Sequence, residues 1–174
     1  MFFILKNLSK KRWPWLLLAS SALILELCAL FFQHVMHLEP CVMCVYERLA
    51  MLGVVITGLV GAICPRFLLL RLIAFAGWIV SSFLGLQLAL EHTKYQLDPS
   101  PFAVCAFLPN FPTWAPLHIW FPWLFNPTGD CSSIVWQFLG YTMPQWLIVS
   151  FVIYIILFII IVGSALYPNR LIRN

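Results

Sequence analysis

Charged side chains are scarce in this sequence. Asp, Glu, Lys and Arg make up 9% of its 174 residues, whereas 63% are hydrophobic, and the mean hydropathy is +0.95. A soluble domain carries about 25% charged residues because its surface has to be hydrated. The scarcity therefore excludes a soluble globular domain and predicts a protein that crosses a membrane several times.

The sequence also lacks internal repeats, low-complexity tracts, and any stripe of basic residues interleaved with aromatic ones. Such a stripe is the usual footprint of a nucleic-acid-binding surface. Because the basic residues are dispersed, no nucleic-acid partner is expected.

Four apolar runs have the length of about 20 residues that a helix needs to cross a bilayer core. They cover approximately residues 13–32, 44–64, 67–90 and 144–166. The first run follows a basic head, but it is longer than the apolar core of a signal peptide, so we expect a retained anchor. The predicted fold is an all-α membrane protein, a single integral membrane domain over residues 1–174 built as a four-transmembrane-helix bundle.

Basic residues gather on one side of the predicted membrane. They precede the first span, join the second to the third, and follow the fourth: Lys6, Lys10, Lys11, Arg12, Arg66, Arg71, Arg170 and Arg173. The positive-inside rule places both termini in the cytoplasm and the loops 33–43 and 91–143 on the outer side. Four cysteines then lie outside, where disulfides persist: Cys41, Cys44, Cys105 and Cys131.

The second outer loop is rich in proline. Eight of the chain's twelve prolines fall between Pro99 and Pro144, which precludes long helices there. Residues 112–125 are unusually aromatic for a solvated loop, so we expect this segment to lie on the bilayer surface. A disulfide between Cys105 and Cys131 would close a loop of about 25 residues around it.

The segment Pro40-Cys41-Val42-Met43-Cys44-Val45-Tyr46-Glu47-Arg48 contains a Cys-x-x-Cys pair at the start of the second span. This spacing allows a small disulfide ring or half of a metal site. Cys44 falls in the predicted first helical turn, where free N–H groups favour a thiolate. Arg48 lies one turn later on the same face and adds a positive charge. The pattern indicates a redox-active pair at a membrane surface.

The four outer cysteines allow three pairings. Spacing and loop membership favour Cys41–Cys44 with Cys105–Cys131, and disulfide exchange would also allow a transient Cys41–Cys131 bond. The two other cysteines of the chain are expected to be small buried hydrophobic residues: Cys28 and Cys64.

A zinc site is the alternative use of the first pair, because His34 and His37 precede Cys41 and Cys44. The order of these ligands is not that of a zinc finger, and zinc gives no role to the cysteines of the second loop. We therefore expect no metal and interpret His34 and His37 as interfacial side chains.

Three further titratable residues are candidates for the site. Glu26 lies inside the first span, where a carboxylate either bonds a neighbouring helix or handles protons. His92 closes the third span, either as a polar helix end or as part of a pocket shared with Arg48. Glu47 has either a proton-handling or a structural role, and the structural interpretation is a charge pair with the adjacent Arg48.

Together these segments resemble the DsbB-type disulfide bond formation proteins of bacterial inner membranes. The resemblance extends from about residue 13 to about residue 164, with the matching segments in the same order. They are Glu26-Leu27, Gln33-His34-Val35-Met36, the segment from Pro40 to Arg48, Glu91-His92-Thr93, Pro99 to Cys105, Gly129-Asp130-Cys131 and Met143 to Leu147.

The resemblance implies a multi-pass enzyme of the bacterial inner membrane that reoxidises a periplasmic dithiol oxidase of the DsbA type. Electrons would pass to a membrane quinone, either ubiquinone or menaquinone. The partner's thiolate would attack Cys105 to form a mixed disulfide, and electrons would then move to Cys41 and Cys44. The Cys44 thiolate would contact the quinone, with Arg48 and His92 beside it.

Two other interpretations stay open on the sequence. A specialised paralogue would use the same chemistry for one dedicated oxidase. A non-enzymatic four-span scaffold with structural disulfides would explain the topology, but it leaves the Cys-x-x-Cys pair beside Arg48 without a purpose.

Overall fold

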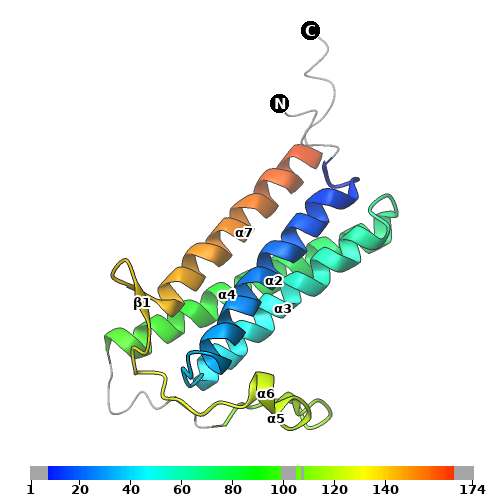
Figure 1. Cartoon of the computed structure of the whole chain (residues 1–174). Coiled ribbons are helices and arrows are strands. Elements are labelled where there is room, and N and C mark those ends of the chain that lie inside the picture. Colours follow the sequence, from blue (N-terminus) through cyan, green and yellow to red (C-terminus); the bar gives the residue numbers. More distant parts are fainter. Residues whose placement is uncertain (1–7, 99–104, 107, 167–174) are drawn as a thin grey trace.

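A computed structural model describes residues 8–98, 105, 106 and 108–166. Four long helices form the bundle: α2 (Arg12–His34), α3 (Val42–Ile63), α4 (Leu68–Leu97) and α7 (Met143–Leu166) (Figure 1). Each is long and apolar enough to cross a membrane. The predicted all-α four-helix membrane fold is confirmed. Lys6, Arg170, Arg173 and the segment 99–104 lie outside the described residues.

Proline and the apolar runs together set the helix ends. Pro144 occupies the first turn of α7, where its missing N–H has no helical partner to lose. Helix α3 ends at Ile63, two residues before Pro65. Helix α4 continues to Leu97, beyond the apolar run that ends near residue 90. Residues 91–98 contain no proline or glycine, so nothing in the chain interrupts the helix there before Pro99.

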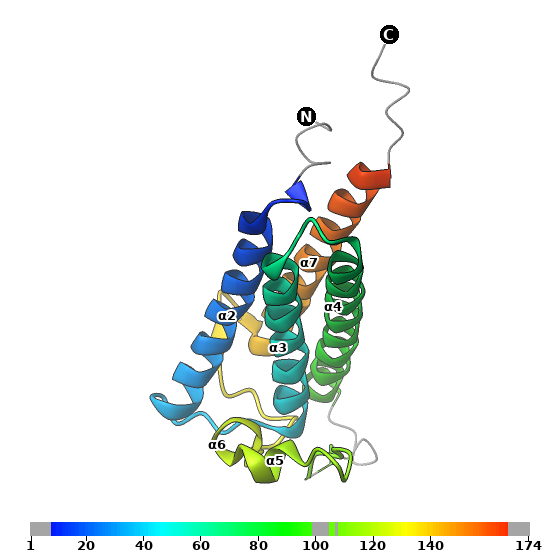
Figure 2. The ribbon, with the colours of Figure 1, turned by 90° about the vertical axis from the view of Figure 1, so that its right-hand side faces the viewer.

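Helix α3 is the central element. It packs against α2 on one side and α4 on the other, and α4 in turn packs against α7 (Figure 2). Half of the apolar window of α3 is buried inside the protein, compared with 17% of that of α7. A side chain on α3 can therefore reach two neighbouring helices, which matters for the site described below.

Large side chains fill the space between the helices. Trp15, Phe75, Trp78 and Phe158 form one aromatic cluster, with ring centroids 5.0–6.4 Å apart. Phe151 of α7 is fully buried and lies against Gly85 of α4, where any side chain would collide with its ring. The glycine is needed for this close approach of α4 and α7.

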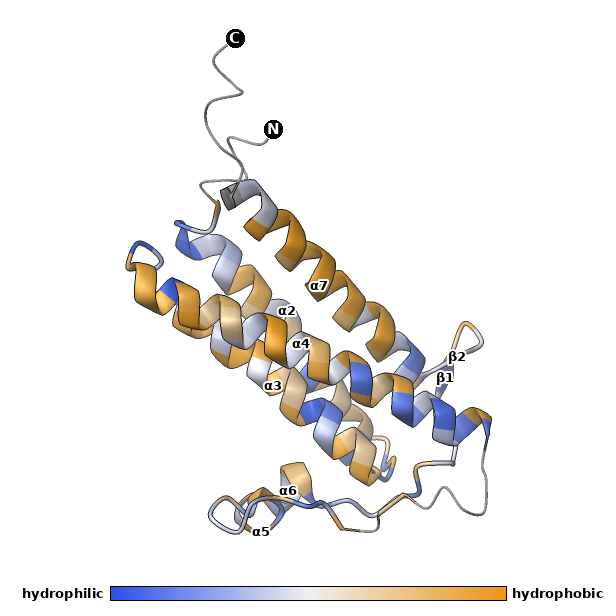
Figure 3. Cartoon of the chain, turned by 180° about the vertical axis from the view of Figure 1, so that it is seen from behind, coloured by the Kyte–Doolittle hydropathy of each residue, from blue (hydrophilic) through white to orange (hydrophobic). Residues whose placement is uncertain are grey.

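The outer faces of the long helices are apolar as well as exposed (Figure 3). Side chains such as Leu17, Ile56, Leu69 and Ile159 are each more than half exposed. Surfaces of this kind suit lipid, because lipid tails solvate apolar groups that water would not.

The two ends of the bundle differ. The start of α2, the end of α7 and the α3–α4 link lie at one end (Figure 1). The opposite end carries the short helices α5 (Leu117–Trp120) and α6 (Pro122–Phe125) and a hairpin of β1 (Gln137–Phe138) and β2 (Tyr141–Thr142). The loop that contains α5 and α6 thus lies beside the start of α3, where the Cys-x-x-Cys pair is located.

Replacing Gly85 by Ala should destabilise the protein, because the new methyl group overlaps Phe151 and overpacking costs about 1–3 kcal/mol. Gly163→Ala is the matched control, since no neighbour lies within 4 Å of a methyl group there. Thermal unfolding in detergent should show a lower midpoint for Gly85→Ala and an unchanged or higher one for Gly163→Ala. Equal shifts would contradict this account of the α4–α7 contact.

Candidate functional site

The Cys-x-x-Cys pair begins helix α3. Cys41 is the N-cap residue, and its Sγ accepts a hydrogen bond from the backbone N–H of Cys44 at 3.3 Å. The two sulfur atoms lie 2.9 Å apart, so a small rotation would close a bond between them. Cys41 is buried and Cys44 is half-buried. The free N–H of the first turn therefore points at the Cys41 sulfur, whereas the sequence interpretation placed the effect of these N–H groups on Cys44.

His92 of α4 lies next to this pair. Its Nε2 is 3.5 Å from Cys41 Sγ, and its Nδ1 is 3.0 Å from Glu47 Oε1. His92 and Glu47 are each only 3% exposed. The carboxylate fixes the ring with its proton on Nδ1, which leaves the Nε2 of a neutral ring as an acceptor facing the Cys41 sulfur.

Arg48 makes a different set of contacts. Its Nε lies 2.9 Å from Glu26 Oε1 of α2, and both side chains are almost completely buried. Its Nη1 donates to Gln33 Oε1 at 2.7 Å and to the Leu124 carbonyl at 2.5 Å. The guanidinium is thus neutralised by Glu26 and holds α2, α3 and the end of α6 together.

The adjacent residues Glu47 and Arg48 therefore have separate partners. The sequence interpretation paired them with each other, but the structure pairs Glu47 with His92 and Arg48 with Glu26. Successive helical side chains point about 100° apart, so on the central helix one faces α4 and the other faces α2.

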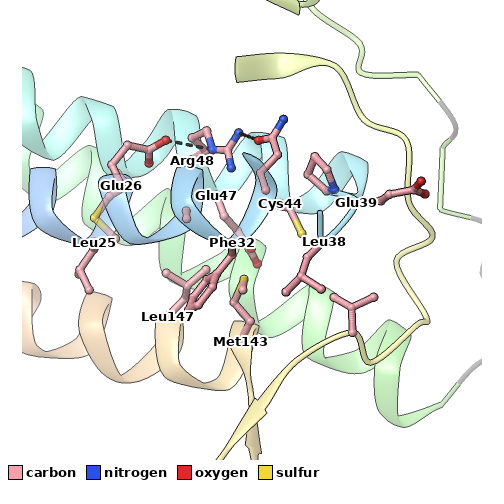
Figure 4. A pocket seen from close by; sticks show the side chains of 15 residues that line it. Leu25, Glu26, Phe32, Leu38, Glu39, Cys44, Glu47, Arg48, Met143 and Leu147 are labelled. Carbon is pink, nitrogen blue, oxygen red and sulfur yellow. Dashed lines mark hydrogen bonds and ion pairs between the residues drawn. The ribbon is translucent and has the colours of Figure 1, made fainter. Parts of the chain in front are cut away.

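A small cavity of about 70 Å³, open on one side, lies between α2, α3 and the start of α7 (Figure 4). Cys44 lines it together with five polar or charged side chains: Glu26, Gln33, Glu39, Glu47 and Arg48. The other lining residues are apolar: Leu25, Ala29, Phe32, Leu38, Pro40, Met51, Val135, Met143 and Leu147. His92 is not among the lining residues, so the cavity joins Cys44 to Arg48 but not to His92.

The second cysteine pair lies against the first. Cys105 and Cys131 form a disulfide with their Cα atoms 6.1 Å apart. Cys131 is 1% exposed and belongs to one buried cluster with Cys41 and Met43, whereas Cys105 is half-buried at its edge. Cys41, Cys44, Cys105 and Cys131 therefore all belong to one cluster at the start of α3.

Backbone hydrogen bonds hold this arrangement. The N–H groups of Thr128 and Gly129 both donate to the Pro40 carbonyl, at 2.9 and 3.0 Å. A methyl group on Gly129 would lie 2.5 Å from the Glu39 carbonyl oxygen, so only glycine allows this approach. The loop is thus bound to the residue that directly precedes Cys41.

The aromatic segment is tied to the same end of the bundle. The backbone N–H of Asn110 donates to Tyr46 Oη at 2.6 Å, and Phe111 packs edge-on against the Tyr46 ring. Trp114, Trp120 and Trp123 are each more than half exposed. The location of this aromatic segment on a bilayer surface stays a prediction, and the exposed tryptophan side chains agree with it.

The remaining predicted residues do not join the cluster. His34 lies with its Nε2 3.0 Å from the Trp123 carbonyl. Within the described part of the chain, the His and Cys side chains close enough to share a metal ion are Cys41, Cys44 and His92, rather than the pair His34 and His37. Cys28 and Cys64 are exposed, so the expectation that they are buried was wrong; in lipid an apolar side chain can face outward.

Sequence reasoning missed two features of the site. Gln33 was noted only as part of the resemblance, although it lies two helical turns after Glu26 and therefore on the same face toward Arg48. The contact of Thr128 and Gly129 with Pro40 could not be predicted from the sequence, apart from the presence of a glycine in a polar stretch. Backbone hydrogen bonds across a long loop require no particular residue types.

The sequence profile described as Disulfide bond formation protein DsbB matches residues 11–161. The chain is 68% identical to a protein named Disulfide bond formation protein B from Psychromonas ingrahamii, over 96% of this chain and 90% of the relative. It is 53% identical to one of the same name from Aeromonas salmonicida, with 98% of each chain covered. A Vibrio cholerae protein of that name is 54% identical over 84% of this chain and 85% of its own.

Gly129→Ala should separate the loop from Pro40, and the separation can be measured by crosslinking. In a Cys44→Ser/Cys105→Ser background, Cys41 and Cys131 are left to pair, and the docked loop favours their disulfide. An overpacking cost of about 1–3 kcal/mol corresponds to about 5- to 150-fold less docked loop. Non-reducing electrophoresis after mild oxidation should show correspondingly slower bond formation.

Thr128→Ala is the control for this crosslinking, because it keeps the backbone N–H that donates to Pro40. It should form the Cys41–Cys131 bond at the parental rate. If Gly129→Ala also crosslinks at the parental rate, the contact does not hold the loop.

Proposed function

Because the chain belongs to the DsbB family of disulfide bond formation proteins, we propose that it oxidises a periplasmic dithiol oxidase of the DsbA type and passes the electrons to a membrane quinone. The observation that carries the proposal is the position of both cysteine pairs in one buried cluster, with a largely apolar cavity that Cys44 also lines. A structural disulfide alone needs neither the second pair nor the cavity.

The partner reacts first with Cys105. Its thiolate attacks the Cys105 sulfur, the Cys105–Cys131 bond breaks, and Cys131 leaves as a thiolate while a mixed disulfide forms. The burial of the two sulfurs supports this direction, because Cys131 is 1% exposed and Cys105 is the accessible member. The partner's second thiol then displaces Cys105, which releases the oxidised partner.

Cys131 is next to Cys41 in the buried cluster, so the electrons continue inward. The Cys131 thiolate attacks Cys41 of an oxidised Cys41–Cys44 pair, forms a Cys41–Cys131 disulfide, and releases Cys44 as a thiolate. Cys105 then attacks Cys131, which restores the outer disulfide and leaves Cys41 and Cys44 reduced. The two electrons of the partner's thiols are now on the inner pair.

His92 and Glu47 handle the proton of Cys41. The Nε2 of His92 is 3.5 Å from the sulfur, within reach of a thiol proton, and Glu47 holds the ring in the tautomer that accepts it. The Cys44 N–H helps by stabilising negative charge on Cys41 at 3.3 Å. The buried Cys41 sulfur therefore has both a proton acceptor and a hydrogen-bond donor within reach.

The side chains that line the cavity suit a quinone head group. Most of them are apolar, and the polar ones include Cys44, Glu26 and Arg48, which matches a ring with carbonyl groups on an isoprenoid tail. Cys44 and Arg48 would hold the ring. A quinone, ubiquinone or menaquinone, supplies the two-electron acceptor that returns Cys41 and Cys44 to their disulfide. Gln33 and Glu26 hold the Arg48 guanidinium in place where it lines this cavity.

A strongly oxidising electron acceptor such as a quinone is needed on thermodynamic grounds. A DsbA-type partner is itself a strong oxidant near −120 mV, and about 30 mV corresponds to about 1.4 kcal/mol for a two-electron couple. Oxidising it with an ordinary protein disulfide near −300 mV would therefore be uphill by about 8 kcal/mol.

In the proposed orientation, the end of the bundle with Arg12, Arg66 and Arg71 faces the cytoplasm, together with both termini, in a bacterial inner membrane. The cysteines, α5 and α6 then face the periplasm, where the partner is found and where disulfides persist.

Replacing Cys44 by Ser should abolish quinone reduction, because the inner pair can no longer form its disulfide. The assay mixes purified protein, a reduced DsbA-type partner and either ubiquinone or menaquinone, and follows the quinone absorbance. Cys28→Ser is the control, since Cys28 is exposed on the outer face of α2, and it should keep full activity. Unchanged activity in Cys44→Ser would support a scaffold with structural disulfides instead.

The mixed disulfide should form on Cys105 rather than Cys131. A partner variant that lacks its second cysteine cannot release itself, so the complex accumulates, and peptide mapping by mass spectrometry identifies the bonded residue. A complex found mainly on Cys131 would overturn the assignment that rests on its burial.

A further inference from the structure

The reduced Cys41–Cys44 pair and His92 form a cluster with the chemistry of a soft-metal site. One atom from each residue, two sulfurs and one ring nitrogen, lies within 4.8 Å of the others. Two thiolates and an imidazole are ligands that Zn²⁺ prefers, and three protein ligands leave a fourth position for solvent.

The distances agree with zinc coordination. Zinc bonds of about 2.3 Å to sulfur and 2.0–2.1 Å to nitrogen, in tetrahedral geometry, place a sulfur and a nitrogen ligand about 3.6 Å apart. The Cys41 Sγ to His92 Nε2 distance is 3.5 Å. Two sulfur ligands would lie about 3.8 Å apart, so the sulfurs, now at 2.9 Å, have to separate by about 1 Å. The half-buried Cys44 side chain has the freedom to do so.

The surroundings are also those of a metal site. His92 presents Nε2 to the cluster because Nδ1 is bonded to Glu47 at 3.0 Å, and a carboxylate behind a histidine ligand is the usual outer support of zinc sites. The Cys44 N–H that points at Cys41 Sγ stabilises a thiolate ligand in the same way. These contacts exist before any ion arrives, so the ligands are already oriented.

We propose that the reduced form of the protein binds one Zn²⁺ ion through Cys41, Cys44 and His92, and that the oxidised form does not. Binding releases the protons of the two thiols and changes no oxidation state. In the Cys41–Cys44 disulfide both sulfurs are bonded to each other, so the thiolate ligands are lost. Zinc and disulfide formation therefore compete for the same pair of sulfurs.

The consequence is reversible inhibition. While both sulfurs are bound to zinc, they cannot close their disulfide, so the electrons stay on the inner pair. The binding step follows from the cluster geometry alone, whereas the inhibition rests on the proposed function. The two can be measured separately.

The binding test uses a Cys105→Ser/Cys131→Ser variant, which leaves Cys41 and Cys44 as the outer thiols. The protein is reduced, freed of reductant without oxygen, and titrated with Co²⁺ as a spectroscopic probe and then with Zn²⁺ against a chromogenic chelator. We expect one ion per chain, with the visible absorption of tetrahedral cobalt bound to thiolates, and no such absorption after oxidation of the pair.

Variants identify the ligands. His92→Ala should lose the cobalt spectrum, and Glu47→Gln, which keeps the side-chain shape, should lower zinc affinity about 10- to 100-fold. His34→Ala and Cys28→Ser/Cys64→Ser are the matched controls and should bind as the parent does. Absence of one-to-one binding, binding that persists in the oxidised protein, or an unchanged affinity in both His92→Ala and Glu47→Gln would overturn the proposal.

The inhibition test adds micromolar Zn²⁺ to the quinone-reduction assay of the wild-type protein, followed by a chelator. Activity should fall and then return. If the protein reduces no quinone even without zinc, the proposed function fails while the binding result stands. If it reduces quinone and zinc leaves the rate unchanged although it binds the variant, the competition between zinc and the disulfide is refuted.

Discussion

The arrangement of the site depends on the pairing of four charged or titratable side chains buried between α2, α3 and α4. A lone charge in such a place would be very costly, so each has to find a partner from another helix. Glu47 meets His92 of α4, and Arg48 meets Glu26 of α2. Because these two consecutive residues of α3 point to opposite neighbours, they fix the rotation of the central helix. That rotation then directs Cys44 into the cavity and Cys41 toward His92 and the outer loop.

A second constraint brings the outer loop to this framework. The Pro40 carbonyl lies one residue before the N-cap of α3 and accepts two backbone hydrogen bonds from Thr128 and Gly129. The same contact buries Cys131 against Cys41 and leaves Cys105 nearer the surface. The loop is thereby attached next to the Cys41–Cys44 pair. A long proline-rich segment can then expose one sulfur to a partner while it holds the other beside the inner pair.

The sequence predicted the fold well, because apolar runs of about 20 residues at low charge leave few structures other than membrane helices. It also identified most of the residues that gather at the site, among them the two cysteine pairs, but not Gln33. It did not predict which side chains pair, since Glu47 and Arg48 are adjacent in sequence and only the packing of α3 against two neighbours separates them. The outward position of Cys28 was missed for a related reason, because a hydropathy pattern in lipid does not distinguish the inner from the outer face of a helix. Contacts made by the backbone, such as the hydrogen bond from Gly129 to Pro40, require no particular residue types and so cannot be predicted from the sequence.

Trapping of thiols in native membranes can show whether the two cysteine pairs exchange electrons with a membrane quinone. Cells with and without quinone are quenched in acid, free thiols are alkylated with a mass tag, and the tags on Cys41, Cys44, Cys105 and Cys131 are counted. All four cysteines should be oxidised when quinone is present, and at least one pair should become reduced when quinone is depleted. If all four stay oxidised in both conditions, the disulfides are static and no electrons pass from them to quinone.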